Sequence, residues 1–433
     1  MAEGLVAEVA SACSGGAVLT GWAIHLQAGP LLTGLVMALP QMAQLLQLPA
    51  AWTTSHFGSR RVAIVLVAAQ RQVGLPLMAL PFLPISVDTQ RSVLVTVALL
   101  AAVLGVLGNN AWVSWMGDLI PSRLRGRYFG RRTALCTMGG ALASAGAGVL
   151  LDRAHGHGWG GQGLALLQVL TCASGVLSTV LMARQHAGRS GCSTGESVWR
   201  RALQPVRDPS VRGFLTYLVA WNVAVGVASS YFSLFMLHDL GMGFTWVALQ
   251  GAGVAVVRMV AAPAWGGVID RVGPRPVLVA CSFGIGVIPF IWLLPTPDCL
   301  WPLAIDCVLT GILWSGHSLA AFNLPLAVTP IDGRPFYLAI FATAAGAALT
   351  LATTAGGLLA RALPAEVSLG GHEMGNLQVL FALSGVLRLG ASLVALRIQH
   401  ASGRDVLTVV RAARAVLPGA VRQIRHSVAR RAA

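Results

Sequence analysis

The stretch GGVIDRVGPR spans residues 266–275 and joins two long apolar runs, near residues 244–267 and 275–296. Glycines permit a tight turn and a close approach of neighbouring helices. An apolar run of about 20 residues is long enough to cross a bilayer as a helix. The stretch therefore predicts a short charged loop between two membrane-spanning helices.

The composition of the whole chain agrees with a membrane protein. Its 433 residues are 55% hydrophobic and only 10% charged, with a mean hydropathy of +0.72, whereas soluble domains are about 25% charged. These values exclude a soluble enzyme, a disordered chain and a disulfide-stapled secreted domain. The long unbroken runs exclude a transmembrane barrel. We predict twelve spanning helices, near residues 5–27, 30–55, 62–84, 92–117, 128–151, 162–184, 212–237, 244–267, 275–296, 301–326, 336–360 and 376–398.

The basic residues define an orientation for these spans. All 30 are Arg, and 24 of them lie in or beside the loops after even-numbered spans or in the C-terminal tail, against three in the opposite loops. Because Arg is enriched in cytoplasmic loops, we expect an integral protein of the bacterial inner membrane with both termini on the cytoplasmic side. This placement argues against a nucleic-acid partner and for contact with anionic lipid headgroups. The N-terminal MAEGLVAEVA lacks a basic region, so no cleaved signal peptide is expected.

An internal repeat divides the chain into two halves. The tetrapeptide LQVL at residues 167–170 recurs 210 residues later, and each copy is followed by SGVL. We predict a six-helix bundle over residues 1–185, a cytoplasmic linker over 186–211, a second bundle over 212–398 and a basic amphipathic tail over 399–433. Repeats of this kind place a substrate site where the halves meet, near the middle of the bilayer.

At residues 266–275 the chain resembles the major facilitator superfamily, whose loops 2–3 and 8–9 carry the pattern G-x-x-x-D-R-x-G-x-R. The resemblance covers essentially the whole chain. It implies an all-α polytopic membrane protein with 12 transmembrane helices in two six-helix pseudo-repeats, and secondary transport rather than enzyme activity. In that family the motif is a conformational latch between the halves. The resemblance therefore assigns gating roles to Gly266, Asp270, Arg271, Gly273 and Arg275.

The matching loop of the first half departs from the pattern. Gly58, Arg60 and Arg61 remain and are assigned to the gate in the same way. Ser55, however, stands where the family has an acidic residue. A latch based on charge is therefore expected to be weaker in the first half.

The loop after the fourth predicted span holds Asp118 among five Arg residues. A carboxylate in that surrounding should be ionised and paired. We expect it to pair with Arg127 or Arg131 as part of the inner gate. The alternative is a solvated basic loop that is drawn to anionic lipid headgroups.

Three Arg residues lie at membrane depth, where an unpaired charge is costly. Arg258 precedes Asp270 by 12 residues, which places it about 18 Å inside the end of its helix. There it would bind an anionic substrate group or pair with a carboxylate. Arg71 and Arg388 are expected to form structural pairs. Among the carboxylates, Glu8 is the one placed clearly within a span, which makes it a candidate to carry a coupled proton.

Polar and aromatic side chains within the predicted cavity helices are candidate substrate contacts. The alternative for each is a hydrogen bond between helices or an anchor at the membrane interface. The candidates are Glu8, Gln41, Gln44, Asn109, Asn110, Trp112, Trp221, Asn222, Tyr231, Gln250, Arg258, Trp314 and His317, with Asn323 beside them. Neither Cys nor His residues follow a ligand spacing, so no metal and no cofactor are expected.

Together these features predict a secondary active transporter of a small organic molecule that works by alternating access. Export of an amphipathic compound is the first expectation, because the candidate contacts are mixed rather than densely charged. Import of an anionic metabolite is the alternative that rests on Arg258. A non-transporting membrane assembly or scaffold protein of the same fold is a further alternative, supported by Ser55 and by the scarcity of carboxylates. The expected partners are the substrate, the lipid bilayer and, in a coupled carrier, a proton.

Overall fold

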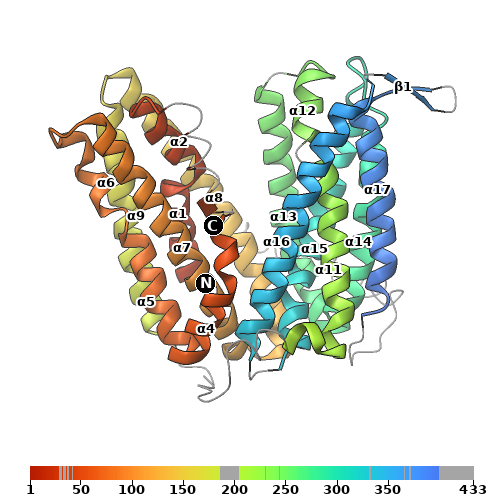
Figure 1. Cartoon of the computed structure of the whole chain (residues 1–433), viewed down its shortest axis with the longest axis horizontal. Coiled ribbons are helices and arrows are strands. Elements are labelled where there is room, and N and C mark those ends of the chain that lie inside the picture. The colour runs from red at the N-terminus through yellow and green to blue at the C-terminus, as the bar shows by residue number, and fades with distance from the viewer. Residues whose placement is uncertain are drawn as a thin grey trace, which may run out of the picture. The chain divides into compact units, whose positions relative to one another are not determined.

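The computed structural model is helical almost throughout. It describes residues 1–28, 32, 36, 39–40, 42–185, 204–229, 231–242, 244–330, 333–364, 366–369 and 372–398. Within these residues, 11 helical segments are long and apolar enough to cross a membrane (Figure 1). The predicted helical membrane protein is therefore confirmed. Eleven of the twelve expected spans are accounted for, and the remaining one, near residues 30–55, is described only in part.

One compact unit draws its described residues from Met1–Ile120, Leu135–Ala202 and Pro330–Thr343. Within it α5 packs against α7 and α1 against α9, around a core in which Trp22, Leu94 and Leu164 are almost fully buried. The unit contains most of α8 (Arg125–Gly156) and the first turns of α16 (Arg334–Ala362). Its other elements are α1 (Ala2–Ser14), α2 (Gly16–His25), η1 (Ala43–Leu46), α4 (Gln47–Phe57), α5 (Ser59–Gln72), α6 (Leu75–Ala79), η2 (Leu80–Phe82), α7 (Val87–Leu119) and α9 (Gly160–Ala183).

The other unit draws its described residues from Pro121–Ala134, Leu203–Thr329 and Ala344–Ala433. Its core contains an aromatic cluster in which the ring centroids of Phe232 and Phe381 lie 4.5 Å apart and those of Phe232 and Trp292 lie 4.8 Å apart. It contains the start of α8 and the rest of α16. Its other elements are η3 (Ser122–Leu124), α11 (Pro209–Ser229), α12 (Tyr231–His238), α13 (Phe244–Val272), α14 (Pro274–Ile291), α15 (Trp301–Val328), β1 (Glu366–Leu369), β2 (His372–Gly375) and α17 (Asn376–Ala395).

Each unit contains one short segment from the opposite half of the sequence. Residues 121–134, which begin α8, belong to the unit built mainly from residues 203–329. Residues 330–343, which begin α16, belong to the unit built mainly from residues 1–120. The two helix starts occupy equivalent places in the internal repeat, so the exchange is reciprocal.

Two glycines with positive φ each form a one-residue connection between helices. Gly58 separates α4 from α5 with φ 87°, and Gly273 separates α13 from α14 with φ 93°. A side chain is strained at such a φ, whereas glycine is not. These are the two loops in which the sequence predicted a sharp turn, and the turn places each following Arg at the start of a helix.

Two local features differ from the sequence-based expectation. The first span is broken at Gly15, whose extended backbone separates α1 from α2. The chain also contains a two-stranded antiparallel hairpin, in which Glu366 pairs with Gly375 and Leu369 with His372. The hairpin is short and the fold class is otherwise as expected. Residues 366–369 alternate polar and apolar side chains, a pattern typical of a strand. A prediction based on long apolar runs does not include so short an element.

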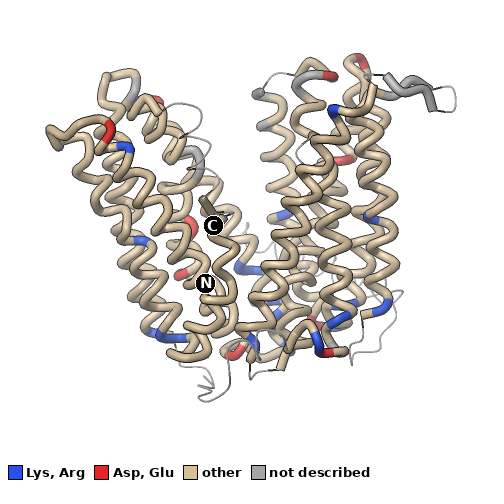
Figure 2. Tube along the Cα trace, viewed as in Figure 1, with Lys and Arg blue, Asp and Glu red and all other residues tan. Residues whose placement is uncertain are grey.

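Charged residues are sparse along the helices of each unit. Figure 2 shows this for the unit that contains α13, where the basic positions gather near one end of the helices and few lie along their length. Helix ends are where charges reach water or lipid headgroups, so charges along the helices need partners within the protein.

Helices α11 and α16 approach closely through small residues. A methyl group built at Gly226 would lie 2.8 Å from both the Leu349 carbonyl oxygen and the Ala352 Cβ. Glycine at such a position lets helix backbones come together in a membrane, where there is no hydrophobic force between helices.

We therefore expect Gly226→Ala to destabilise the protein by about 1–3 kcal/mol, because the added methyl group overpacks the contact. Gly251→Ala is the matched control, since nothing lies within 4 Å of a Cβ built there; it should be neutral or stabilise by up to about 1 kcal/mol. Thermal unfolding of the two variants in phospholipid nanodiscs measures the difference. Equal unfolding temperatures would contradict the proposed close packing.

Candidate functional site

The carboxylate of Asp270 lies in the last turn of α13 and accepts two hydrogen bonds from the start of α8. Its Oδ1 lies 2.7 Å from the Gly126 amide nitrogen, and its Oδ2 lies 2.9 Å from the Arg127 amide nitrogen. The first amides of a helix have no partner within that helix, and the helix dipole favours an anion there. With only 6% of its side chain exposed, Asp270 is a buried cap on α8.

The Arg127 guanidinium adds little to this cap. Its Nε lies 3.8 Å from Oδ2 of Asp270, and 53% of the Arg127 side chain is exposed. Ion pairs of this exposed kind contribute about 0–1 kcal/mol. The backbone amides of α8 therefore hold Asp270, and the neighbouring Arg271 is exposed.

The backbones of α8 and α13 approach each other because both helices carry small residues at the contact. Gly266 faces Gly126, and a methyl group built at Gly130 would lie 2.6 Å from the Ala262 carbonyl oxygen. Gly126 and Gly130 form a G-x-x-x-G spacing, and Ala262 and Gly266 form its counterpart on the facing helix. Sequence reasoning missed this pairing, although the four-residue spacing was a visible signal for it.

At the start of α16 the corresponding contact is an ion pair. Arg334 donates from Nη1 to Oδ1 of Asp118, and the two side chains are only 4% and 10% exposed. Nearby, the Asn110 side-chain amide donates to the Pro335 carbonyl oxygen over 3.2 Å. The sequence predicted Arg127 or Arg131 as the partner of Asp118, and the partner that the structure describes, Arg334, was not among them. Arg334 lies more than 200 residues away in the chain, so local reading of the Arg-rich loop had no access to it.

The two helix starts are equivalent in position but not in chemistry. Arg125 begins α8 and donates from Nη1 to the Leu326 carbonyl oxygen at 3.1 Å, near the end of α15. Arg334 begins α16 and reaches the carboxylate of Asp118 near the end of α7. Ser55, which stands where Asp270 stands in the second half, donates its hydroxyl to the Trp52 carbonyl oxygen of its own helix.

Two Arg residues predicted for the gate lie against helix C-termini of their own unit. Arg60 donates to the Ala183 carbonyl oxygen at 2.8 Å, at the end of α9, and Arg275 donates to the Leu396 carbonyl oxygen at 2.7 Å, beyond α17. A cation at a helix C-terminus satisfies free carbonyl groups and complements the helix dipole. These contacts fasten each turn to its own bundle. Arg61 and Arg131 are exposed.

A polar and aromatic cluster is buried in the unit that contains α13. The Tyr217 hydroxyl lies 2.8 Å from Nε2 of His317 and 2.7 Å from the Ser282 hydroxyl. The His317 ring is stacked on Trp221, with ring centroids 4.6 Å apart, and contacts Trp314 edge-on. Three of the predicted substrate contacts therefore come together, while Tyr217 and Ser282 were not predicted.

Arg258 lies beside this cluster on α13 and is half-buried. Its Nη2 donates to the Ser318 hydroxyl at 2.8 Å, and its carbonyl oxygen accepts from the Ser315 hydroxyl at 3.3 Å. Among the residues that the structure describes, no carboxylate lies within ion-pair distance of Arg258. The guanidinium thus retains donors that the protein does not use.

Other predicted contacts form structural hydrogen bonds instead. Gln250 donates to the Leu303 carbonyl oxygen at 2.9 Å and to Asp306 at 3.0 Å. Asn222 and Asn323 each donate to a carbonyl oxygen one turn earlier in their own helix. The Tyr231 hydroxyl lies against Gly357. Gln41 lies outside the described residues, and Trp112 is not among the residues that line the cavity of the other unit.

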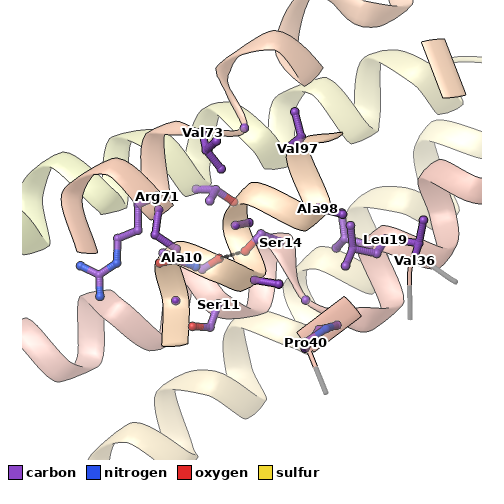
Figure 3. Close-up of a pocket in the computed structure, with 18 of the residues that line it drawn as sticks. Ala10, Ser11, Ser14, Leu19, Val36, Pro40, Arg71, Val73, Val97 and Ala98 are labelled. Carbon is purple, nitrogen blue, oxygen red and sulfur yellow. Dashed lines mark hydrogen bonds between the residues drawn. The ribbon is translucent and has the colours of Figure 1, made fainter. Parts of the chain in front are cut away.

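The unit that contains α1 has a half-open cavity of about 520 Å³ (Figure 3). Gln44 and Asn109 line it, as predicted contacts, together with polar residues that were not predicted, among them Gln47, Gln70 and Gln168. These three glutamines were visible in the sequence as polar residues within or beside predicted spans. The predicted Asn110 is buried at the contact with Pro335 instead.

Membrane-depth carboxylates are also placed differently from the expectation. Glu3 lies in α1, is buried, and forms an ion pair with Arg71 at 3.9 Å, while Arg71 also donates to the Ser178 hydroxyl. Arg71 thus has the structural pair that was predicted, but its partner was overlooked because the expected span began at residue 5. Glu8 is half-buried beside Gly140 of α8. Arg388 lies over the Phe232 ring at 6.0 Å.

Within the described residues, no group of three His, Cys, Asp or Glu side chains is arranged to hold a metal ion. The basic amphipathic tail predicted over residues 399–433 lies outside the described residues.

Comparisons with known proteins relate the fold to membrane transporters. The family model described as Major Facilitator Superfamily matches residues 4–324. A comparison with curated proteins gives no match. The crystal structure of a bacterial homologue of the iron transporter ferroportin in an outward-facing state is similar, with a TM-score of 0.69 and 13% identity over 92% of this chain and 97% of that chain.

Two sugar symporters have similar structures. The proton:xylose symporter XylE bound to 6-bromo-6-deoxy-D-glucose matches with a TM-score of 0.70 and 14% identity, over 94% of this chain and 96% of that chain. The E. coli fucose:proton symporter FucP matches with a TM-score of 0.72 and 12% identity, over 92% of this chain and 97% of that chain. At these identities the likeness concerns the fold, and the predicted fold class is confirmed.

The buried ion pair at the start of α16 predicts a large effect on stability. Asp118→Asn removes one charge and leaves the buried Arg334 unpaired, which should destabilise the protein by about 3–5 kcal/mol. The matched control is Asp88→Asn, because the Asp88–Arg91 pair at 3.0 Å has its carboxylate 91% exposed and should contribute about 1 kcal/mol at most. Thermal unfolding in nanodiscs separates the two variants. An Asp118→Asn variant as stable as Asp88→Asn would show that the pair is not buried as described.

Proposed function

This chain belongs to the major facilitator superfamily, and we propose that it moves a small organic molecule across the membrane by alternating access. In such a cycle the two halves of a transporter rock about a central site, which opens to one side of the membrane at a time. The observation that carries the proposal is the pair of contacts at the starts of α8 and α16, where segments are exchanged between the two units.

An alternating-access cycle needs contacts that favour one state and break in another. The Asp270 cap on α8 suits this role because charge–dipole and capping interactions are each worth about 0.5–2 kcal/mol. Since 1.4 kcal/mol corresponds to a tenfold change in an equilibrium, such a cap biases a conformation without locking it. We propose that the Asp270 and Asp118 contacts form together in one state. From the Arg distribution, we place them on the cytoplasmic side of a bacterial inner membrane.

For the transported molecule, we propose a small amphipathic compound, moved outward. In support, the cluster around His317 and Trp221 combines aromatic rings with hydrogen-bonding groups, and the cavity beside Gln70 combines amides with apolar walls. Neither place concentrates charges of one sign. A coupled proton remains part of the proposal, with Glu8 as its first candidate carrier.

A second candidate function is favoured by Arg258. Its half-buried guanidinium is bonded to the Ser318 hydroxyl at 2.8 Å and has no carboxylate within ion-pair distance among the described residues. A charge at this depth is stabilised by an anion that arrives with the substrate. Import of an anionic metabolite would use that interaction.

Asp270→Asn should lower transport, because the amide keeps the shape of the side chain but loses the charge that the α8 N-terminus favours. In cells that express the wild-type protein, we expect energy-dependent efflux of the fluorescent probes rhodamine 6G or Nile red. The variant should show an initial efflux rate lower by about tenfold, equivalent to about 1.4 kcal/mol.

The matched control is Asp298→Asn, which removes a carboxylate from an exposed loop position and should transport as the wild type does. Equal efflux by all three proteins would contradict the role of Asp270. A folded wild-type protein that exports neither probe would contradict export of amphipathic molecules and would favour the scaffold alternative.

Arg258→Gln should separate the two candidate substrate classes. We expect the anion 4-phenylbutyrate to raise the unfolding temperature of the wild type if Arg258 binds substrate, since a ligand at 100 times its dissociation constant stabilises by about 2.7 kcal/mol. The variant should lose that stabilisation. The neutral analogue 4-phenylbutanol is the control ligand. Equal stabilisation of both proteins by the two compounds would show that Arg258 has a structural role.

A further inference from the structure

The cavity of about 520 Å³ lies within a single unit, among α1, α2, α4, α5, α7 and α9. Its size falls within the range of about 300–1,000 Å³ that is typical of small-molecule sites. Figure 3 shows the lining residues converging on it from helices that are far apart in the sequence. A cavity of this size inside a membrane-spanning bundle needs contents that match its lining.

Amide side chains dominate the polar part of that lining. They are Gln44, Gln47, Gln70, Asn109 and Gln168. Each amide group carries two donors and a carbonyl oxygen with two acceptor sites. Lipid tails supply no hydrogen bonds, so amides at this depth need partners in the protein or in the cavity.

The protein satisfies only a small part of this capacity. Gln47 donates to the Gln44 side-chain oxygen at 2.7 Å, and Gln168 makes one weak contact of 3.8 Å to the Cys172 sulfur. Gln47 and Gln168 are 5% and 4% exposed. Within the described residues, Gln70 has no hydrogen-bond partner for its side chain. These amides therefore have donors and acceptors free to meet a molecule in the cavity.

The cavity offers no free charge to such a molecule. No carboxylate is among the residues that line it. Arg71 is the one cationic lining residue, and its guanidinium is taken up by the Ser178 hydroxyl and by Glu3. In Figure 3 the Arg71 side chain points away from the other labelled residues. A charged ligand would be desolvated here without compensation.

Most of the remaining lining is apolar and includes Leu19, Val36, Leu77, Val97 and Trp22. A ligand that fits must therefore present hydroxyl groups to the amides and an apolar part to this wall. We propose that the cavity is a binding site for a neutral, hydroxyl-rich amphipathic small molecule. The inference concerns binding within one unit and holds whether or not the chain exports its ligand.

Gln70 and Gln72 provide a matched test, because both lie on α5 and differ in their partners. Gln72 donates to the Cys172 carbonyl oxygen of α9 at 3.0 Å and is not among the cavity residues. Gln70 lines the cavity. Replacing an amide that has a protein partner loses a hydrogen bond, whereas replacing one that faces the cavity removes an unsatisfied group.

The experiment measures thermal unfolding in phospholipid nanodiscs, since sugar-based detergents would compete for the site. The probes are phenyl β-D-glucoside and its anionic counterpart phenyl β-D-glucuronide. We expect the glucoside to raise the unfolding temperature of the wild type by a few degrees and the glucuronide to have little effect. For Gln70→Leu, the dissociation constant of the glucoside should rise by about tenfold, while stability without ligand should not fall. Gln72→Leu should be less stable without ligand but should bind the glucoside as the wild type does.

Three results would overturn the proposal. The glucoside failing to stabilise the wild type would mean that the cavity holds water only. Equal binding of the glucuronide would show that the cavity accepts charge. A Gln70→Leu variant as destabilised as Gln72→Leu would show that the Gln70 amide has a structural partner. None of these results depends on transport, so they are distinguishable from a failure of the proposed function.

Discussion

The absence of water in the bilayer core is the constraint on which this structure depends. Backbone groups there are satisfied only within helices, and the few charges at that depth need partners in the protein. Arg71 meets Glu3 and Ser178. Asp306 accepts from the Trp292 ring nitrogen and the Thr310 hydroxyl, each at 2.9 Å. Where such pairing is incomplete, as at Arg258 or in the amide-lined cavity, the unused hydrogen-bonding capacity points to a ligand.

The two helix starts at α8 and α16 show how one geometry carries two kinds of chemistry. Each start is packed in the unit formed mainly by the opposite half of the chain. At α8 the charge sits on Asp270, and the partners are backbone amides. At α16 a buried guanidinium meets Asp118. Breaking the first contact is expected to cost only about 0.5–2 kcal/mol, which suits a reversible latch. Separating the buried ion pair is expected to cost more. We therefore expect the contact at α16 to be the stronger of the two, whereas Ser55 in place of an acid had indicated a weaker latch in the first half.

Polar chemistry within the helices is divided between two places. One is the cluster of Tyr217, His317 and Trp221 beside Arg258, and it combines a cation with aromatic rings. The other is the amide-lined cavity, whose cationic residue Arg71 is already paired and whose lining is more apolar than polar. The first place would suit an anion, and the second would suit a neutral hydroxylated compound. Ligand binding by variants of Arg258 and Gln70 therefore distinguishes the two substrate classes.

The sequence by itself determined the membrane class, the eleven spans found among the described residues and the positions of the tight turns at Gly58 and Gly273, because apolar run length and glycine are local signals. It also indicated that Asp270 and Asp118 matter. It did not determine their partners. Arg334 meets Asp118 across 216 positions, and Gly126 meets Asp270 across 144. The cavity likewise depends on how several helices converge, so that Gln47, Gln70 and Gln168 face one space. Hydrophobic patterning acts over a turn or a strand and can be read from neighbours, whereas the pairing of charges and amides is decided by which helices pack together, and only the tertiary structure specifies that.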